Sequence, residues 1–204
     1  MPHRPKVDRE GRPFYMTNII SVGILQERGI MGENTVPTVF EWAGGASAFE
    51  RLTTVFYRRV LQDPILAPIF ASMPPDHPKH VALWLGEVFR GPETYTSQLG
   101  GYPHMMSKHR NLGLKEEQRA RWIQLIASSA DEAGLPSDPE FRSAFIAYLE
   151  WGTRIALANS QPGATPPAEA PVPHWGWGEA PPLPPFPNTS DPSSHVEIIE
   201  KTSE

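Results

Sequence analysis

The sequence predicts an all-α protein, and three observations support this class. Apolar residues recur at spacings of three and four along several segments, which is the period of an amphipathic helix. Glycine and proline stand where these segments end, and they are the residues that most often stop a helix. No segment shows the alternation of apolar and polar residues that a half-buried strand requires.

The patterned region lies between two segments of different composition. Residues 1–37 mix charge, proline and glycine without a period, so we expect a disordered N-terminal extension. Residues 38–160 carry the helical pattern and form the one expected domain. Residues 161–204 hold 11 of the 24 prolines, so we expect a disordered tail whose removal leaves the melting temperature nearly unchanged. Trp175 and Trp177 leave open the alternative that the tail is anchored across an apolar groove.

The first expected helix begins at Ser47. Gly44 and Gly45 permit a sharp turn before it, and Ser47 with Glu50 has the spacing of a capping box. Its apolar stripe consists of Phe49, Leu52, Phe56 and Val60, and Asp63-Pro64 ends it. Tyr57 lies at the edge of this stripe, so its side chain should face inward or nearly so.

Two further helical segments follow. ILAPIF at residues 65–70 predicts a short helix that Phe70 closes. A longer helix is expected over residues 77–89 after the N-cap Asp76, with an apolar stripe that a histidine heads: His77, Val81, Trp84, Leu85 and Val88. Gly91-Pro92 ends it, and PETYTSQLGGY at residues 92–102 is expected to be an irregular connection.

A short helix is expected within residues 103–114, and it carries His109. Met105, His109 and Leu112 are spaced i, i+4 and i+7, so an imidazole shares one face with soft apolar groups. Such a face could hold a flat apolar cofactor. The alternative is a histidine that serves the core or the surface and binds no ligand.

Two longer helices complete the pattern. Residues 115–133 place Gln118, Trp122, Leu125, Ile126 and Ser129 on one face, and Gly134 stops that helix. The last helix opens at Ser137-Asp138-Pro139 and is expected to bury Phe141, Phe145, Tyr148, Leu149, Gly152, Ile155 and Ala156.

Four residues with polar groups are therefore expected to point inward: Tyr57, His77, His109 and Trp122. A buried polar group without a partner costs about 1 to 3 kcal/mol, so a shared ligand is one explanation for the four. The other is that Tyr57 and Trp122 bond to nearby backbone carbonyls.

Composition excludes several functional classes. A net charge of −5 and the lack of a basic stripe argue against binding to nucleic acid. The absence of cysteine excludes disulfides, thiolate nucleophiles, iron–sulfur clusters and covalent C-x-x-C-H attachment of haem. The longest apolar run, at residues 19–25, is far shorter than the roughly 18 residues of a membrane span. We therefore expect a cytoplasmic protein without nucleic-acid or membrane partners.

Five motifs in fixed order resemble the truncated haemoglobins. They are WAGGASAF, FYRRVLQDPILAPIF, RGPETY, MSKHRNLGL and RARWIQLI, and they extend over roughly residues 37–160. Trp122 makes the chain most similar to group II of that family. The resemblance implies a two-on-two helical sandwich around a b-type haem (iron protoporphyrin IX), with His109 as the proximal iron ligand.

The resemblance also implies roles for the residues around the haem. Tyr57, His77 and Trp122 match distal positions that stabilise the bound ligand. Phe70, Val81 and Trp84 match positions against the porphyrin, and His80 and Lys108 match positions that can meet the propionates. His77 and Phe70 depart from the usual pattern, because group II members often have a small residue and a tyrosine or histidine there.

The function implied is binding of dioxygen, nitric oxide and carbon monoxide at a five-coordinate haem iron. Oxygen transport, nitric-oxide dioxygenation and peroxidase-like chemistry are all open, as are a reductase partner and a homodimer. Two other classes of protein are alternatives to this one. The first is a non-haem metal site built from His77, His80, His104 and His109 with Glu87. The second is an interaction module in which PPLPPFP at residues 181–187 docks into an aromatic groove.

Overall fold

The computed structural model describes residues 36–167 and 169–183, and this part of the chain contains helices and no strand. The helices are α2 (Val39–Trp42), α3 (Gly45–Val60), α4 (Ala67–Phe70), α5 (His77–Val88), α6 (Thr94–Leu99), α7 (Gly101–His109), α8 (Glu116–Glu132) and α9 (Pro139–Asn159). The predicted all-α class is confirmed. The N-terminal extension expected over residues 1–37 lies almost entirely outside the described residues, as does the tail from residue 184 onward.

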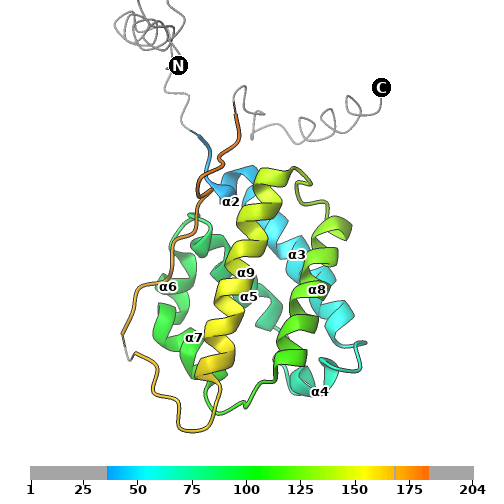
Figure 1. The fold of residues 1–204 in the computed structure, drawn as a ribbon, viewed down its shortest axis with the longest axis vertical. Coiled ribbons are helices and arrows are strands. Elements are labelled where there is room, and N and C mark those ends of the chain that lie inside the picture. Colours follow the sequence, from blue (N-terminus) through cyan, green and yellow to red (C-terminus); the bar gives the residue numbers. More distant parts are fainter. Residues whose placement is uncertain (1–35, 168, 184–204) are drawn as a thin grey trace, which may run out of the picture. The chain divides into compact units, whose positions relative to one another are not determined.

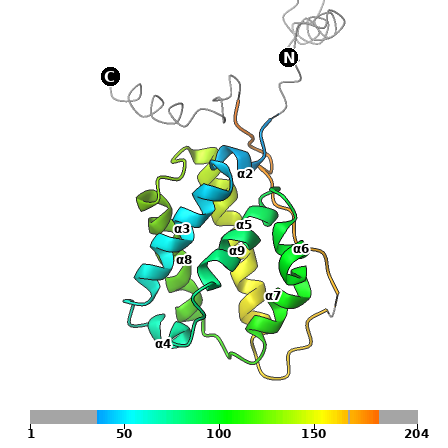
Figure 2. The same cartoon turned by 180° about the vertical axis from the view of Figure 1, so that it is seen from behind.

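The long helices form two pairs that cross. Helix α3 packs against α5 and against α8, and α8 packs against α9. Figure 1 shows α8 and α9 on the near side, and Figure 2, from behind, shows α3 and α5 on the opposite side. This is the two-on-two helical sandwich expected from the sequence. Helices α6 and α7 lie together beside it.

Five phenylalanines form the core at one end of the sandwich. Their rings follow one another at centroid distances between 5.6 and 5.9 Å, in the order Phe40, Phe49, Phe89, Phe145 and Phe141. All but Phe40 are fully buried. Because this stack joins α2, α3, the end of α5 and the start of α9, it fixes how the helices diverge toward the other end, where Tyr57, His77 and His109 lie.

The start of the domain differs from the expected one. The capping box is formed by Thr38 and Glu41 and opens the short helix α2, in which the Glu41 carboxylate accepts from the Thr38 backbone N–H at 2.7 Å. Helix α3 begins at Gly45, directly after Gly44 in the left-handed region at φ 100°. The Ser47 hydroxyl donates to the Gly44 carbonyl at 3.4 Å and accepts from Arg51, and α3 has no side-chain cap, so the predicted capping role of Ser47 is wrong.

The segment expected to be irregular, residues 92–102, contains helix α6. The buried Glu87 carboxylate, from α5, accepts from the Thr96 backbone N–H at 2.9 Å and from the Thr96 hydroxyl. The Glu87 carboxylate thus caps an amide in the first turn of α6. Because this cap comes from another helix, the residues next to α6 in the sequence do not reveal it. Gly100, left-handed at φ 92°, separates α6 from α7.

The N-cap predicted for the last helix is confirmed. The Asp138 carboxylate accepts from the Phe141 backbone N–H at 2.8 Å, with Pro139 in the first turn. Its second oxygen accepts from the Trp42 indole N–H at 3.0 Å, which also ties α2 to the start of α9. Phe141, Phe145, Tyr148 and Leu149 are buried as expected.

The connection between α3 and α4 is held by one buried carboxylate. Asp63 accepts from the backbone N–H groups of Ile65 and Leu66, at 3.0 and 3.1 Å, and from the Arg121 guanidinium of α8 at 2.6 Å. Burial alone would raise the pKa of Asp63, but these donors and the positive charge of Arg121 bring it below its ordinary value.

Replacing Asp63 with asparagine is expected to lower the free energy of unfolding by about 2 kcal/mol at neutral pH, since a charged hydrogen-bond network is lost. Because the pKa is lower in the folded protein, the advantage of the parent is complete above about pH 5 and disappears as the pH falls below about 4. Urea unfolding from pH 3 to 7 measures it. Asp131→Asn removes the exposed Asp131–Arg142 pair and serves as control, with an expected loss within about 0.5 kcal/mol. Equal losses for both variants would contradict the prediction.

The first part of the tail is packed on the domain, contrary to the expectation of disorder from residue 161. Val172 is buried, and the Trp175 backbone N–H donates to the Val88 carbonyl at 2.7 Å. The Trp177 indole N–H donates to the Pro37 carbonyl at 2.7 Å, and its ring lies edge-on against Trp42. The alternative in which the two tryptophans anchor the tail therefore describes residues 172–177 correctly.

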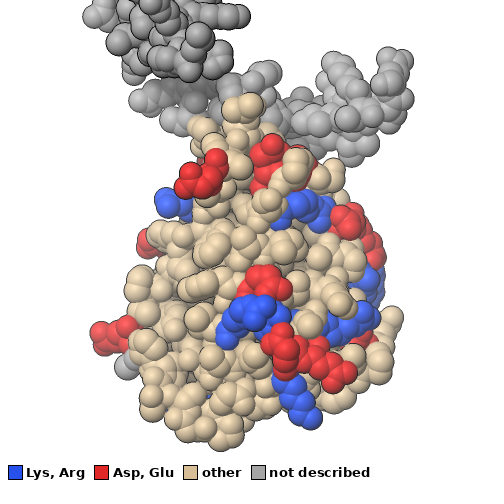
Figure 3. Space-filling view, in the orientation of Figure 1, with Lys and Arg blue, Asp and Glu red and all other residues tan. Residues whose placement is uncertain are grey.

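Charged side chains of both signs are mixed on the face formed by α8 and α9 (Figure 3). Glu150 pairs with Arg119 at 2.9 Å and with Arg154 at 3.1 Å, and Glu132 pairs with Arg58. No helix within residues 36–183 that the structure describes is long and apolar enough to cross a bilayer.

Candidate functional site

A cavity of about 380 Å³ lies at the end of the sandwich opposite the phenylalanine stack. Residues of α3, α4, α5, α6, α7 and α9 and of the start of α8 line it. All nine residues that the family resemblance assigned to the haem site line this one cavity: Tyr57, Phe70, His77, His80, Val81, Trp84, Lys108, His109 and Trp122. Its volume is in the range of sites that enclose a small organic ligand.

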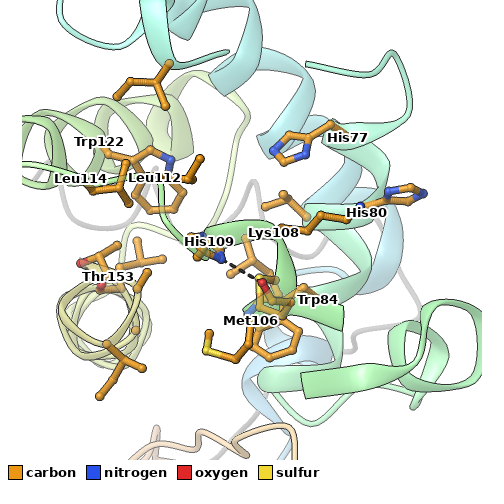
Figure 4. A pocket seen from close by; sticks show the side chains of 18 of the residues that line it. His77, His80, Trp84, Met106, Lys108, His109, Leu112, Leu114, Trp122 and Thr153 are labelled. Carbon is orange, nitrogen blue, oxygen red and sulfur yellow. Dashed lines mark hydrogen bonds between the residues drawn. The ribbon is translucent and has the colours of Figure 1, made fainter. Parts of the chain in front are cut away.

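His109 is the last residue of α7 and lines the cavity, and it stands near the centre of the view in Figure 4. Its Nδ1 lies 3.0 Å from the Met105 carbonyl oxygen, one turn earlier. A carbonyl can only accept, so Nδ1 carries the proton and Nε2 keeps a free lone pair. Burial lowers the pKa of His109 below its ordinary value, which favours the neutral ring. A neutral imidazole whose second nitrogen is fixed by a backbone carbonyl is the usual form of a histidine that binds a metal.

The predicted face of Met105, His109 and Leu112 is altered at its end. Helix α7 stops at His109, and Asn111 adopts a left-handed conformation at φ 60°. Leu112 is therefore outside the helix, although it still lines the cavity. The turn at Asn111 brings Leu112 and Leu114 back against the cavity (Figure 4), where they supply apolar surface next to His109.

Tyr57 and His77 form a polar pair on the other side of the cavity. The Tyr57 hydroxyl lies 2.9 Å from His77 Nε2, across the space between α3 and α5. Burial lowers the pKa of His77 to about 4, with the charges of His80, His109 and Lys108 acting in the same direction. Burial also raises the pKa of Tyr57, so both side chains are neutral at pH 7. One proton is shared in this hydrogen bond, and either ring can donate it.

Trp122 of α8 stands across the cavity from His77 in Figure 4. Its ring packs edge-on against Phe56, with centroids 5.0 Å apart, and Phe56 in turn packs against Tyr57. Among the hydrogen bonds of the described residues, none uses the Trp122 indole N–H. This N–H is therefore a free donor in the wall of the cavity.

Phe70, Val81 and Trp84 give the cavity apolar walls. Phe70 lies edge-on to Tyr57 at 5.6 Å and next to His77 at 6.0 Å. Val81 follows His77 by one turn of α5. The Trp84 indole N–H donates to the Tyr148 hydroxyl at 2.6 Å, which joins α5 to α9 across the cavity edge.

His80 and Lys108 lie beside each other at the rim (Figure 4). Lys108 is exposed, and His80 Nε2 is 3.3 Å from the Asp76 carboxylate. Both side chains have N–H donors and Lys108 is positively charged, so they could bind an acidic group at the mouth of the cavity.

The sequence did not identify Tyr148 and Gly152 as lining residues. A side chain at position 152 would begin 3.3 Å from the Tyr148 ring, so the glycine leaves room for that ring to lie along α9. The signal that could have revealed this is a glycine in the interior of a helix, which usually has a packing reason.

The non-haem metal alternative finds no support among the described residues. No three histidine, aspartate or glutamate side chains there are grouped so that they could hold one ion. Glu87, its proposed carboxylate ligand, is already bonded to Thr96. The proline-rich motif of the interaction alternative begins at residue 181 and extends mostly outside the described residues.

Crossed helix pairs that enclose an apolar cavity, with one backbone-fixed histidine on a short helix, define a truncated globin. Residues 38–151 match the model of the family described as bacterial-like globin, so the chain belongs to that family. It is a haem-binding globin of the truncated type.

Known relatives agree with this assignment. The chain is 27% identical over 117 residues to group 2 truncated hemoglobin YjbI of Bacillus subtilis, which covers 57% of this chain and 86% of the relative. It superimposes on the hemoglobin of Chloroflexus aurantiacus with a TM-score of 0.53 and 30% identity, over 59% of this chain and 98% of the other. The truncated oxygen-avid haemoglobin of Bacillus subtilis gives a TM-score of 0.53 at 25% identity, over 59% and 99%.

Proposed function

We propose that the chain holds a b-type haem in this cavity through His109 Nε2, and binds dioxygen, nitric oxide and carbon monoxide beside Tyr57, His77 and Trp122. The observation that carries the proposal is the arrangement of His109, fixed through Nδ1 to the Met105 carbonyl, opposite a neutral Tyr57–His77 pair. The chain has no cysteine, which favours a non-covalently held haem. His80 and Lys108, at the rim, are the proposed partners of its propionates.

The residues of the chain fit such a group. Phe70, Val81 and Trp84 would contact its ring, and they exclude water from the space around His109. When bound, the haem supplies an iron position at which a diatomic gas can coordinate. Tyr57 or His77 can donate one hydrogen bond toward that position, and Trp122 can donate another, because its N–H is free.

We further propose a role in oxygen or nitric-oxide redox chemistry or in sensing, and not in rapid oxygen transport. Hydrogen-bond donors in a low-dielectric cavity stabilise bound dioxygen, because dioxygen draws electron density from the iron. Slow release of dioxygen does not suit an oxygen carrier. Redox turnover requires an external electron donor, so a reductase partner is part of this proposal.

Reconstitution of the purified chain with hemin tests the cofactor. We expect an intense Soret band with about one haem per chain, and a shifted band when the reduced protein meets carbon monoxide. Metal analysis of the protein as purified is the control. A protein without a Soret band that instead contains a stoichiometric transition metal would contradict the proposal.

A further inference from the structure

Residues 172–177, which we call the strap, cross the domain outside the region shared with the family. The family match ends at residue 151. Beyond α9 the chain turns back and runs past α7 and α6 toward α2, as both Figure 1 and Figure 2 show. The strap is part of this returning segment, and its Trp177 ring packs on Trp42 of α2.

Two hydrogen bonds join the second half of the strap to the domain backbone. The Trp175 N–H donates to the Val88 carbonyl in the last turn of α5, and the Trp177 indole donates to the Pro37 carbonyl, each at 2.7 Å. A carbonyl in the last turn of a helix lacks a helical partner, so the Trp175 bond supplies one. Pro173 fixes its own φ angle, which reduces the entropy lost when the strap is ordered.

The strap also reaches the cavity. Pro173 is one of the residues that line it, together with Tyr148, Trp151 and Gly152 of α9. The Trp175 ring packs against those of Tyr148 and Trp151, each at a centroid distance of 5.8 Å. The strap and the α9 side chains that it contacts thus form part of the cavity wall.

Tyr148 connects the strap to the distal helix. Its ring lies between Phe89 and Trp175, and its hydroxyl accepts from the Trp84 indole at 2.6 Å. Trp84 is on α5, the same helix as His77 and Val81. A displaced Trp175 would free the Tyr148 ring on one side and loosen the bond that sets the distance between α5 and α9.

We propose that the strap is a further part of the haem site, in which Pro173 lines the cavity and Trp175 holds Tyr148 and Trp151 in place as its wall. This inference rests on the proposed haem function. It predicts that loosening the strap at Trp175 accelerates haem loss, whereas loosening it at Trp177, which packs on Trp42 away from the cavity, does not.

The test compares full-length variants that are reconstituted with hemin. Haem loss is followed as transfer to excess apomyoglobin, and the melting temperature of each apoprotein is measured separately. We expect Trp175→Ala to lose haem about tenfold faster than the parent and Trp177→Ala less than about twofold faster, at similar losses of apoprotein melting temperature. Pro173→Ala is a milder variant, with about threefold faster loss expected. His174→Ala, at an exposed strap position, is the matched control and should equal the parent.

Trp175→Ala and Trp177→Ala together distinguish a strap that forms part of the haem site from a strap that only stabilises the fold. If haem loss simply follows the apoprotein melting temperature in both tryptophan variants, or if Trp175→Ala and Pro173→Ala lose haem at the parent rate, the strap proposal is overturned alone. A parent chain that takes up no haem would overturn the proposed function, and the strap proposal with it.

Discussion

Replacing His109 with alanine is expected to leave a folded protein that does not retain haem. His109 is the one cavity histidine whose Nδ1 is fixed by a backbone carbonyl of its own helix, so its Nε2 is the prepared donor. Loss of an outer-shell partner of a metal ligand costs roughly 10- to 100-fold in affinity, and loss of the ligand itself should exceed that. The measurement is the haem content after gel filtration, together with the Soret spectrum in both oxidation states.

Two controls separate loss of the ligand from loss of the fold. His104 is on the same helix, but its ring faces Tyr95 at 6.0 Å, so His104→Ala should keep its haem. Imidazole added to His109→Ala should restore a histidine-like spectrum, because the small molecule can enter the space that the side chain leaves. An unchanged spectrum of His109→Ala without imidazole would show that the proximal assignment is wrong.

Most of the helices could be predicted because their signals are local. The stripe of Phe49, Leu52, Phe56 and Val60 identifies α3 by spacing alone, and all four residues are fully buried. The cap Asp138 precedes Pro139 directly and gives the start of α9 within the sequence itself. Signals of this kind involve residues within one or two turns of each other.

The predictions for residues 92–102 and for the first part of the tail were wrong because those segments depend on residues that are distant in sequence. Helix α6 depends on the Glu87 carboxylate of another helix, and its own sequence, TYTSQL, has few apolar residues at helical spacing. The strap depends on the Val88 and Pro37 carbonyls, which are 87 and 140 positions away from their donors Trp175 and Trp177. Composition could show two tryptophans among prolines, but not the surfaces against which they pack.

The site was predictable as a set of residues but not as a set of contacts. Periodicity places Tyr57, His77 and Trp122 on inward faces of three helices, and family resemblance supplies their expected roles. The hydrogen bond between Tyr57 and His77 depends on how α3 and α5 cross, and the two helices also meet through the contact of Phe49 with Phe89. That bond bears on the expected chemistry, because the Tyr57 O–H remains available to a ligand when His77 Nε2–H is the donor of the bond.

Replacing Trp122 or Tyr57 with phenylalanine is expected to accelerate release of dioxygen by about 10- to 100-fold each. A hydrogen bond to a ligand that carries partial negative charge contributes about 1.5 to 3 kcal/mol, which corresponds to that range of dissociation rates. Carbon monoxide carries little charge, so its release should change far less. Stopped-flow mixing with both gases measures the two effects. Tyr102→Phe makes the same chemical change at another cavity residue, on α7, and is the matched control.

His77 should behave differently from the other two because it shares a hydrogen bond with Tyr57. In His77→Ala the Tyr57 hydroxyl loses its partner at 2.9 Å, so His77 no longer orients its O–H. The effects of His77→Ala and Tyr57→Phe should therefore not add in the double variant. His77→Ala also tests whether the imidazole competes for the iron, since association would then become faster. If Tyr57→Phe, Trp122→Phe and His77→Ala all release dioxygen at the parent rate, these side chains only pack the cavity and the proposed polar stabilisation is wrong.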